Sequence, residues 1–159
     1  MPAWYHFFGS KATPIFLSGE WGFWYDLQVM AISRKKFREA AFQALYSNDV
    51  GEGEISRLLK EKGKLPSGAV REVEAFSVKV KKVQKQLDDR LSAEPGYEKV
   101  GPIERNILRL ALYELTFERE CPGEVVIAEA VRICQKFGTQ KSSKYVNAIL
   151  DTIFKEASS

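Results

Sequence analysis

The chain has few of the side chains on which metal sites and histidine catalysis depend. Its 159 residues include two cysteines, Cys121 and Cys134, and one histidine, His6. This inventory assembles no zinc site, and the spacing of the two thiols predicts no disulfide framework. We therefore expect free thiols in a reducing, cytoplasmic compartment. No apolar run approaches the length of about 18 residues that a membrane-spanning helix requires, so no membrane partner is predicted.

Catalytic motifs are also missing. The sequence contains no glycine-rich phosphate loop, no Gly-x-Ser-x-Gly and no His-Glu-x-x-His, and a single histidine all but excludes histidine acid–base catalysis. Glu114 and Glu118 are one helical turn apart, but a solvated surface pair is the better interpretation. Cys134 is expected to be a core thiol. We therefore predict that the chain is not an enzyme and that it has no cofactor and no metal.

The composition that is present is typical of one globular domain. Apolar residues make up 45% of the chain and charged residues 28%, and the net charge is +3. A chain of this length buries enough surface to form a core without covalent cross-links. The slight excess of positive charge favours an acidic partner only weakly.

Residues 1–29 differ from the rest of the chain. They hold all three tryptophans and only three charged side chains, and glycine and proline interrupt them repeatedly. Met30 is followed at once by higher charge density and helical periodicity. We expect Met30 to be the true start, residues 1–29 to be a wrongly assigned or disordered upstream extension, and residues 30–159 to be the domain. The alternative is an aromatic arm that binds a partner.

The remaining sequence predicts helices joined by short glycine- and proline-containing breaks. Apolar residues recur at spacings of three and four, and no segment alternates convincingly as a strand. Ser33 is expected to cap the first helix, Gly138 to end the fifth, and Ser142 or Ser143 to cap the last. The predicted helices cover about 33–47, 52–62 and 69–91, followed by helices that open at Pro102, Pro122 and the Ser142–Ser143 pair. The fold class is all-α, a compact bundle of about six to seven helices.

The most informative segment is a basic block at the start of the first helix. Arg34, Lys35, Lys36 and Arg38 place four cations within five residues, and an apolar helical face follows directly. A packed helix of this kind presents concentrated positive charge at one end, which suits contact with a phosphate backbone. A solvated helix end with scattered cations is the alternative on charge alone.

Three segments, in order and in register over about residues 31–156, carry a resemblance. They are Arg34-Lys35-Lys36-Phe37-Arg38-Glu39-Ala40-Ala41-Phe42-Gln43-Ala44-Leu45-Tyr46-Ser47, the apolar helix from Ile103 to Leu115, and the stretch from Val126 to Asp151. Together they resemble the NusB family of bacterial transcription antitermination factors. The chain departs from the usual family pattern at Ala128, Tyr145 and Ala148, where Asn, Phe and Gly are usual. The resemblance does not cover residues 1–29.

The resemblance implies a function without a chemical reaction. It implies an all-α fold of two small helical bundles that pairs with NusE, a ribosomal protein that also acts in transcription. The pair would bind the single-stranded boxA element of nascent RNA in ribosomal RNA operons. The complex would then join RNA polymerase and suppress termination.

The resemblance also suggests roles for individual residues. The helix-one cations would hold phosphates, and rings would stack on unpaired bases near the last helix break. Tyr145 is the stronger ring candidate, since Phe137 and Tyr145 are otherwise read as core residues at helix ends. Lys141 stands where some relatives are acidic, which should strengthen phosphate binding. The expected RNA-binding set is Arg34, Lys35, Lys36, Arg38, Phe137, Lys141, Lys144 and Tyr145, and the expected NusE contacts are Tyr46 and Glu104.

Other functions stay open at this point. The chain is alternatively a general RNA-binding helical domain or a structural homodimer without antitermination activity. A DNA-binding helical protein predicts similar affinity for duplex DNA. NusB-like domains also resemble the N-terminal part of some ribosomal RNA methyltransferases, but this chain is too short for a methyl-donor domain.

Overall fold

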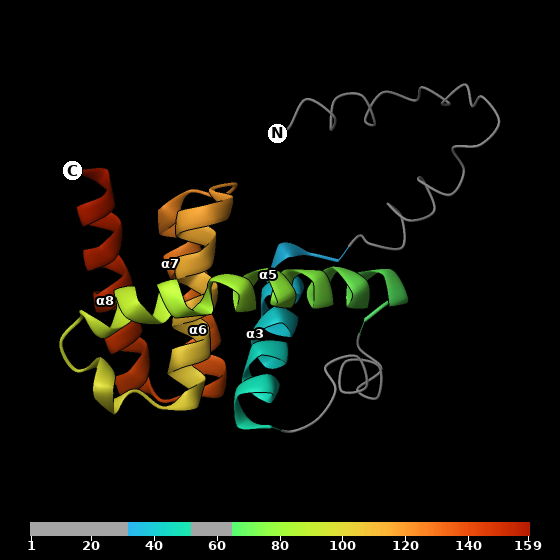
Figure 1. Ribbon diagram of the computed structural model, residues 1–159, viewed down its shortest axis with the longest axis horizontal. Helices are drawn as coiled ribbons and strands as arrows, with labels where there is room; N and C mark the ends of the chain where they lie inside the picture. Colours follow the sequence, from blue (N-terminus) through green and yellow to red (C-terminus); the bar gives the residue numbers. More distant parts are fainter. Residues whose placement is uncertain (1–31, 52–64) are drawn as a thin grey trace.

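The computed structural model describes residues 32–51 and 65–159, and within these ranges the chain is helical and has no strand (Figure 1). The all-α prediction is therefore confirmed for the described part of the chain. The elements are α3 (Arg34–Val50), α5 (Ser67–Ser92), the 3₁₀ turn η1 (Tyr97–Lys99), α6 (Pro102–Tyr113), the π-helical turn η2 (Glu114–Glu118), α7 (Gly123–Phe137) and α8 (Gln140–Ser158). Five α-helices in the described ranges are fewer than the six to seven predicted. The helix expected over 52–62 and the segment 1–29 lie outside the described residues.

The start and end of α3 follow from its sequence. Ser33 caps the helix as predicted, because its Oγ accepts a hydrogen bond of 3.2 Å from the backbone N–H of Lys36. The helix ends at Gly51, whose φ of +76° lies in the left-handed region that glycine adopts readily. Small side chains at Ala40 and Ala44 allow α3 to pack closely against the start of α5, where they meet Val70 and Val73.

Helix α6 lies at the centre of the bundle. It packs against α3, α5, α7 and α8, and Figure 1 shows α5 crossing in front of the other helices. Every residue from 106 to 113 is buried, so the prediction that this helix is enclosed on nearly all sides is confirmed. One apolar cluster includes residues of all five helices. None of the helices in the described ranges has an apolar stretch long enough to cross a membrane.

Two polar side chains of the buried α6 face are satisfied by a cluster at the end of α3. Arg109, only 6% exposed, donates to both carboxylate oxygens of Asp88 on α5 at 2.7 and 2.8 Å, and it lies 3.4 Å from the Asp49 carboxylate. Asn106 donates to Asp49 at 3.0 Å and accepts from Arg109 at 3.2 Å. This cluster ties α3, α5 and α6 together, because each buried polar group has a partner on another element.

The break between α7 and α8 differs from the prediction in one respect. Thr139, and not Ser142 or Ser143, caps α8: its backbone is extended, and its Oγ1 accepts from the N–H of Ser142 at 3.1 Å. The two serines therefore lie in the first turn of the helix. Gly138 follows α7 as predicted. A Cβ on Gly138 would stand 3.0 Å from the Cys134 carbonyl oxygen, so close packing favours glycine there.

Replacing Arg109 with methionine tests the polar cluster. Arg109→Met keeps an unbranched apolar side chain but leaves Asp88 without its cation and Asp49 with only the more distant Arg105, at 3.6 Å. We expect the free energy of unfolding to fall by about 3 kcal/mol in urea denaturation. Lys85→Met is the matched control, because Lys85 pairs only with the neighbouring Asp89 on the exposed side of α5. Equal urea midpoints for the two variants would contradict a structural role for the cluster.

Candidate nucleic-acid interface

The first turn of α3 presents cations to solvent. Arg34, Lys35 and Lys36 are exposed, and the turn contains no acidic residue. The N-terminal end of a helix already carries a partial positive charge, which normally favours carboxylates there. The arrangement is therefore unfavourable for the helix alone and favourable for an anion that approaches it.

Arg38 does not share this exposure, which corrects the expectation for this residue. It is 4% exposed, and its guanidinium donates to both carboxylate oxygens of Glu114, with Nε–Oε1 and Nη2–Oε2 distances of 2.8 Å. Hydrogen bonding to Glu114 raises the pKa of Arg38 although burial opposes it. The guanidinium is thus engaged inside the protein, and it does not present its charge to a phosphate in solvent.

Glu114 likewise differs from the sequence interpretation. The residue is 5% exposed and is not half of a solvated surface pair with Glu118. Its carboxylate lies where α6 passes into the π-helical turn η2, next to the first turn of α3. Arg38 and, at 3.9 Å, Arg34 compensate its charge. A partner 76 residues away in sequence explains why helical spacing alone could not reveal the pair.

A second group of predicted residues surrounds the break between α7 and α8. Lys141 and Lys144 are exposed in the first turns of α8, where again no acidic residue stands in the first turn. The Tyr145 hydroxyl donates to the Pro95 carbonyl at 3.2 Å, and its ring lies 3.6 Å from the position of a Cβ on Gly96. The Phe137 ring packs at 5.1 Å from Phe42. Both rings are half-buried, so each combines a packing contact with an accessible edge or face.

The two residues expected to contact NusE lie near the same break. The Tyr46 ring is 6.1 Å from Phe42, which also contacts Phe137. A Glu104 carboxylate oxygen is 3.6 Å from the position of a Cβ on Gly138. Burial, with the charge of Glu104, raises the pKa of Cys134 to about 11, and the thiol is fully buried as predicted. The expected partner residues therefore adjoin the expected ring residues.

The structure does not bring the two groups of cations together. Arg34 of the α3 group lies 3.9 Å from Glu114, just beyond the end of α6. The break that precedes the α8 group lies against Glu104, near the start of α6. The ten residue steps from Glu104 to Glu114 correspond to about 15 Å along the helix axis. A ligand that contacts both groups must be an extended polyanion and not a small molecule.

An ion-pair cluster between the two groups was missed by sequence reasoning. Glu39 on α3 accepts from Arg132 and, at 2.6 Å, from Lys136, both on α7. Burial opposes ionisation of Glu39, but Lys136 and Arg132 outweigh this and hold its pKa below the ordinary value. Lys136 also lies 5.3 Å from the centre of the Phe137 ring. The cluster holds α3 against α7 and leaves Lys136 exposed beside a candidate stacking ring.

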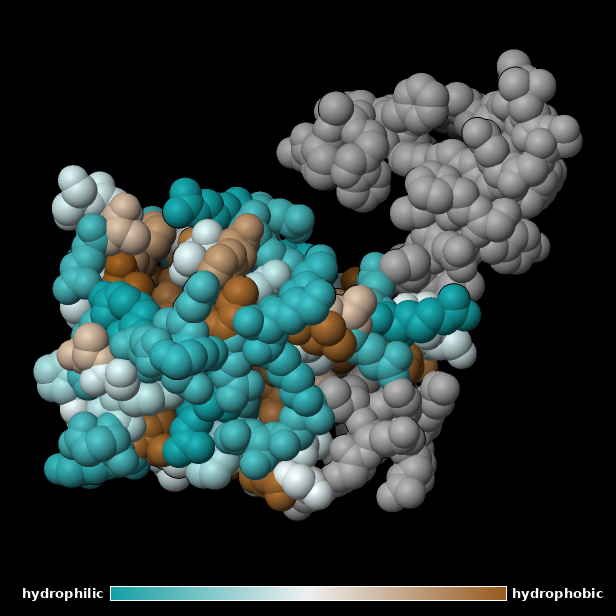
Figure 2. Space-filling model, viewed as in Figure 1, coloured by the Kyte–Doolittle hydropathy of each residue, from teal (hydrophilic) through white to brown (hydrophobic). Residues whose placement is uncertain are grey.

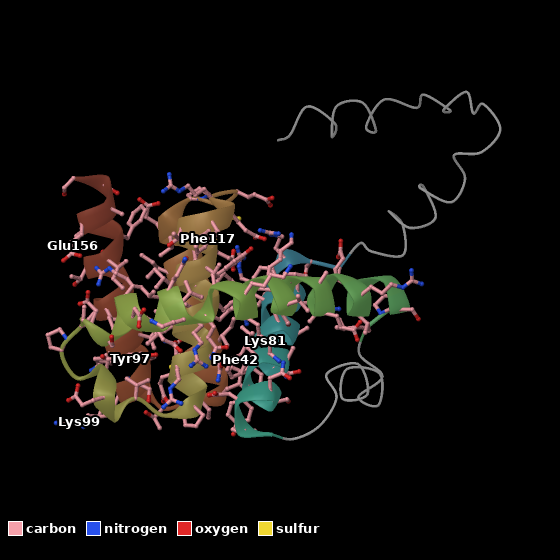
Figure 3. All side chains as sticks on the ribbon, viewed as in Figure 1. Phe42, Lys81, Tyr97, Lys99, Phe117 and Glu156 are labelled. Carbon is pink, nitrogen blue, oxygen red and sulfur yellow. The ribbon has the colours of Figure 1, made fainter. Side chains whose placement is uncertain are left out.

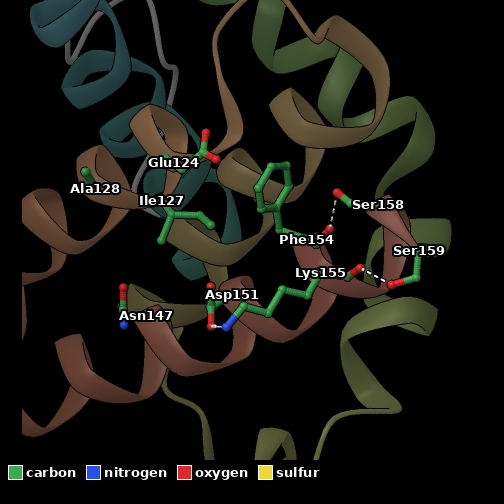
Figure 4. A pocket seen from close by; sticks show the side chains of 9 residues that line it. All are labelled: Glu124, Ile127, Ala128, Asn147, Asp151, Phe154, Lys155, Ser158 and Ser159. Atoms are coloured by element: carbon green, nitrogen blue, oxygen red, sulfur yellow. Dashed lines mark hydrogen bonds and ion pairs between the residues drawn. The ribbon is translucent and has the colours of Figure 1, made fainter.

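A cleft between α7 and α8 lies apart from these residues (Figure 4). Its volume is about 760 Å³, and none of the predicted site residues lines it. The labelled Lys155 side chain turns toward Asp151, with which it pairs at 2.6 Å. The described residues contain no group of three or more histidine, cysteine or acidic side chains arranged to hold a metal ion.

Replacing Arg38 separates its structural role from that of its exposed neighbours. Arg38→Met leaves the buried Glu114 without its main partner, so we expect a loss of about 3–4 kcal/mol in the free energy of unfolding. The double variant Arg38→Met/Glu114→Leu should recover most of this loss, since no uncompensated charge then remains. Lys36→Met, on the exposed side of the same helix, should not lower the melting temperature and should raise it slightly, because a cation is removed from the positive end of the helix. Equal melting temperatures for Arg38→Met and Lys36→Met would contradict a stabilising role for the Arg38–Glu114 pair.

Comparison with known proteins identifies relatives over most of the chain. The model of the NusB family matches residues 35–155. The transcription antitermination protein NusB of Shewanella amazonensis is 36% identical over 127 residues, covering 76% of this chain and 93% of the relative. The protein of the same name from Pseudothermotoga lettingae is 30% identical over 128 residues, covering 77% of this chain and 91% of the relative.

Solved structures agree with this assignment. T. maritima NusB superposes with a TM-score of 0.67 at 32% identity, over 80% of this chain and 94% of that protein. A chain from a structure of the antitermination factors NusB and NusE in complex with double-stranded RNA gives a TM-score of 0.69 at 25% identity, over 77% of this chain and 96% of that one. The range matched by the family model contains α6 and α7 and nearly all of α3 and α8, and the chain belongs to the NusB family.

Proposed function

We propose that this protein is a transcription antitermination factor. Paired with the ribosomal protein NusE, it binds boxA-type single-stranded RNA of ribosomal RNA operons and helps RNA polymerase to read through terminators. Its work then takes place in the cytoplasm, where bacterial RNA is transcribed. The observation that carries the proposal is the inverted charge pattern at two helix N-termini, those of α3 and α8.

These two helices contrast with the other helices that bear charge in their first turns. Glu104 in α6 and Glu124 in α7 follow the ordinary rule that places a carboxylate near the positive end of a helix. α3 and α8 have cations there and no carboxylate. Each such cation costs helix stability, by about 0.3–1 kcal/mol in general. An anionic ligand explains this arrangement, because phosphate gains from the cation and from the helix end at once.

The separation of the two groups supports a nucleic acid over a small anion. About 15 Å along the axis of α6 separates Glu104 from Glu114, near which the two groups lie, and half-buried rings accompany the cations at the α7–α8 break. Phosphate contacts with ring stacking are typical of single-stranded RNA recognition. The related structure that contains NusB and NusE also contains RNA, which is double-stranded there. It supports RNA as the class of ligand and NusE as the partner, and the single-stranded form is inferred from the rings beside the cations.

The same comparison supports a function without catalysis. The matched family and its curated relatives are antitermination factors, and the cleft between α7 and α8 lies away from the charged ends. The protein acts by holding RNA and protein partners in one assembly. Antitermination itself requires RNA polymerase, which we propose joins after the RNA and NusE have bound.

Lys141→Gln tests the RNA interface through its salt dependence. For single-stranded RNA each lost phosphate contact lowers the slope of log affinity against log salt concentration by about 0.7. We expect this change, with weaker binding, in fluorescence anisotropy of a labelled boxA-type RNA with the full chain and NusE. Lys155→Gln at the other end of α8 is the matched control. Scrambled RNA, duplex RNA and duplex DNA should bind more weakly than boxA, and equal binding of all four would reject the proposed function.

Glu104→Lys tests the partner surface. The Glu104 side chain is partly exposed at the start of α6, and it also complements the positive end of that helix. We expect at least a tenfold loss of NusE affinity in isothermal titration calorimetry, with a melting temperature close to that of the wild type. Glu124→Lys, in the equivalent turn of α7, controls for the helix-end effect. A similar loss of stability in both variants with unchanged NusE affinity would assign Glu104 a structural role only. Light scattering of the free chain would reveal a homodimer.

A further inference from the structure

An exposed aromatic ring lies on the turn that follows α6, close to the cations of α3. Phe117 lies in the π-helical turn η2 and is 46% exposed. Figure 3 labels it near the end of the bundle from which α7 begins, whereas Phe42, which packs on Phe137, lies lower beside α3. The described part of the chain exposes only a few large apolar side chains, and Phe117 is the aromatic one among them.

The position of this ring is set by a continuous series of ring contacts. Phe37 meets Phe76 edge-on at 5.4 Å, Phe76 meets Tyr113 edge-on at 5.2 Å, and Tyr113 stacks on Phe117 at 5.3 Å with an interplanar angle of 28°. The series begins in α3, passes through α5 and α6, and ends at the surface. Phe117 is therefore held against Tyr113 on one side while nearly half of its surface remains open to solvent.

Cations lie around the turn that carries this ring. Arg34 is 47% exposed at its side chain and lies 3.6 Å from the Glu120 carboxylate, just beyond the turn. Lys79 follows Phe76 by one turn of α5, and Lys79, Lys81 and Lys82 are all exposed. Burial and the charges of Glu120 and Glu114 raise the pKa of the Glu118 carboxyl, and the positive charges of Arg34 and Lys79 act in the opposite direction.

We propose that Phe117 is a stacking platform for one unpaired RNA base, whose neighbouring phosphates are held by Arg34 and Lys79. The inference rests on the proposed function and deepens it, because it supplies a ring for the α3 cations, which lie far from Phe137 and Tyr145. One RNA strand would then run from the α7–α8 break toward η2. Base stacking on an aromatic side chain tolerates any sequence, since every base has a flat face.

The surroundings favour RNA over a protein partner at this ring. Leu115 of the turn packs on the core, and the side chains next to the ring are polar, namely Thr116, Glu118, Arg119 and Glu120. Hydrophilic side chains also dominate the face that carries α5, around small separate apolar patches (Figure 2). A protein interface core is depleted in charge and gathers several apolar side chains. The Arg34–Glu120 pair is exposed and weak, so a phosphate can replace the carboxylate.

The test compares Phe117→Leu with Phe117→Tyr in RNA binding. Leucine keeps the apolar character of the side chain and removes the ring, whereas tyrosine keeps the ring. Both are measured with the full chain and NusE on boxA RNA extended by several nucleotides at each end, and on scrambled RNA of equal length. We expect Phe117→Leu to weaken binding of both RNAs about tenfold and Phe117→Tyr to bind like the wild type. Val125→Leu, on an exposed apolar side chain of α7, is the control.

A fluorescent base locates the contact directly. RNAs that carry 2-aminopurine at successive positions outside boxA should include one position at which fluorescence is quenched by the wild type and by Phe117→Tyr but not by Phe117→Leu. Lys79→Gln should lower the salt slope by about 0.7 relative to wild type, and Lys85→Gln, further along α5, should not. Thermal melting by circular dichroism confirms that the variants are folded.

The outcomes separate this inference from the proposed function. Unchanged affinity and unchanged quenching in Phe117→Leu would overturn the stacking role even if boxA is preferred over scrambled RNA. A tenfold loss on both RNAs without any boxA preference would support the stacking role and reject the boxA function. Loss of NusE affinity alone in Phe117→Leu would overturn the inference in favour of a protein contact. Failure of the wild type to bind either RNA would overturn both.

Discussion

The buried ion pair between Arg38 and Glu114 is the contact on which the placement of the basic surface depends. It joins the second turn of α3 to the point where α6 passes into η2, and Arg38 also donates to the Cys121 sulfur at 3.3 Å in the segment before α7. Without it, this end of α3 would be held by apolar contacts and by the Glu39 ion pairs with α7, and it would lack the two-point hydrogen-bonded pair that fixes its direction against α6. The buried Arg38 therefore fixes the orientation of α3, and with it the direction in which the exposed cations of this helix point.

Much of the fold could be predicted because it depends on sequence patterns that span only a few residues. The apolar spacing of α5 and α6, the Ser33 cap and the glycine after α7 each depend on residues within one or two turns of each other. Thr139 was missed as the cap of α8 because three hydroxyl residues stand close together there, and only the backbone angles distinguish among them. The helix count was too high for the described residues, in part because one predicted helix falls outside them.

The sequence predicted the positive charge of the candidate site but not which of its side chains are exposed to solvent. The sequence pattern gives no reason to distinguish among the four cations Arg34, Lys35, Lys36 and Arg38. Arg38 is buried because it pairs with Glu114, which is 76 residues away in the sequence. Phe117 is the opposite case: an aromatic residue near a helix end is ordinarily expected in the core, but this ring is exposed. The π-helical turn shifts the register of the residues after Tyr113. It depends on tertiary packing, and no short-range sequence pattern predicts it.

The inverted charges at the starts of α3 and α8 have a consequence for how ionic strength acts on this protein. In the free chain, these cations repel the helix ends on which they stand, and dissolved ions weaken that repulsion. In the complex, the same ions compete with the phosphates for the same cations. Added salt should therefore favour the folded free chain and disfavour the assembly, so that a buffer chosen to keep the purified protein stable would be poorly suited to observing what it binds.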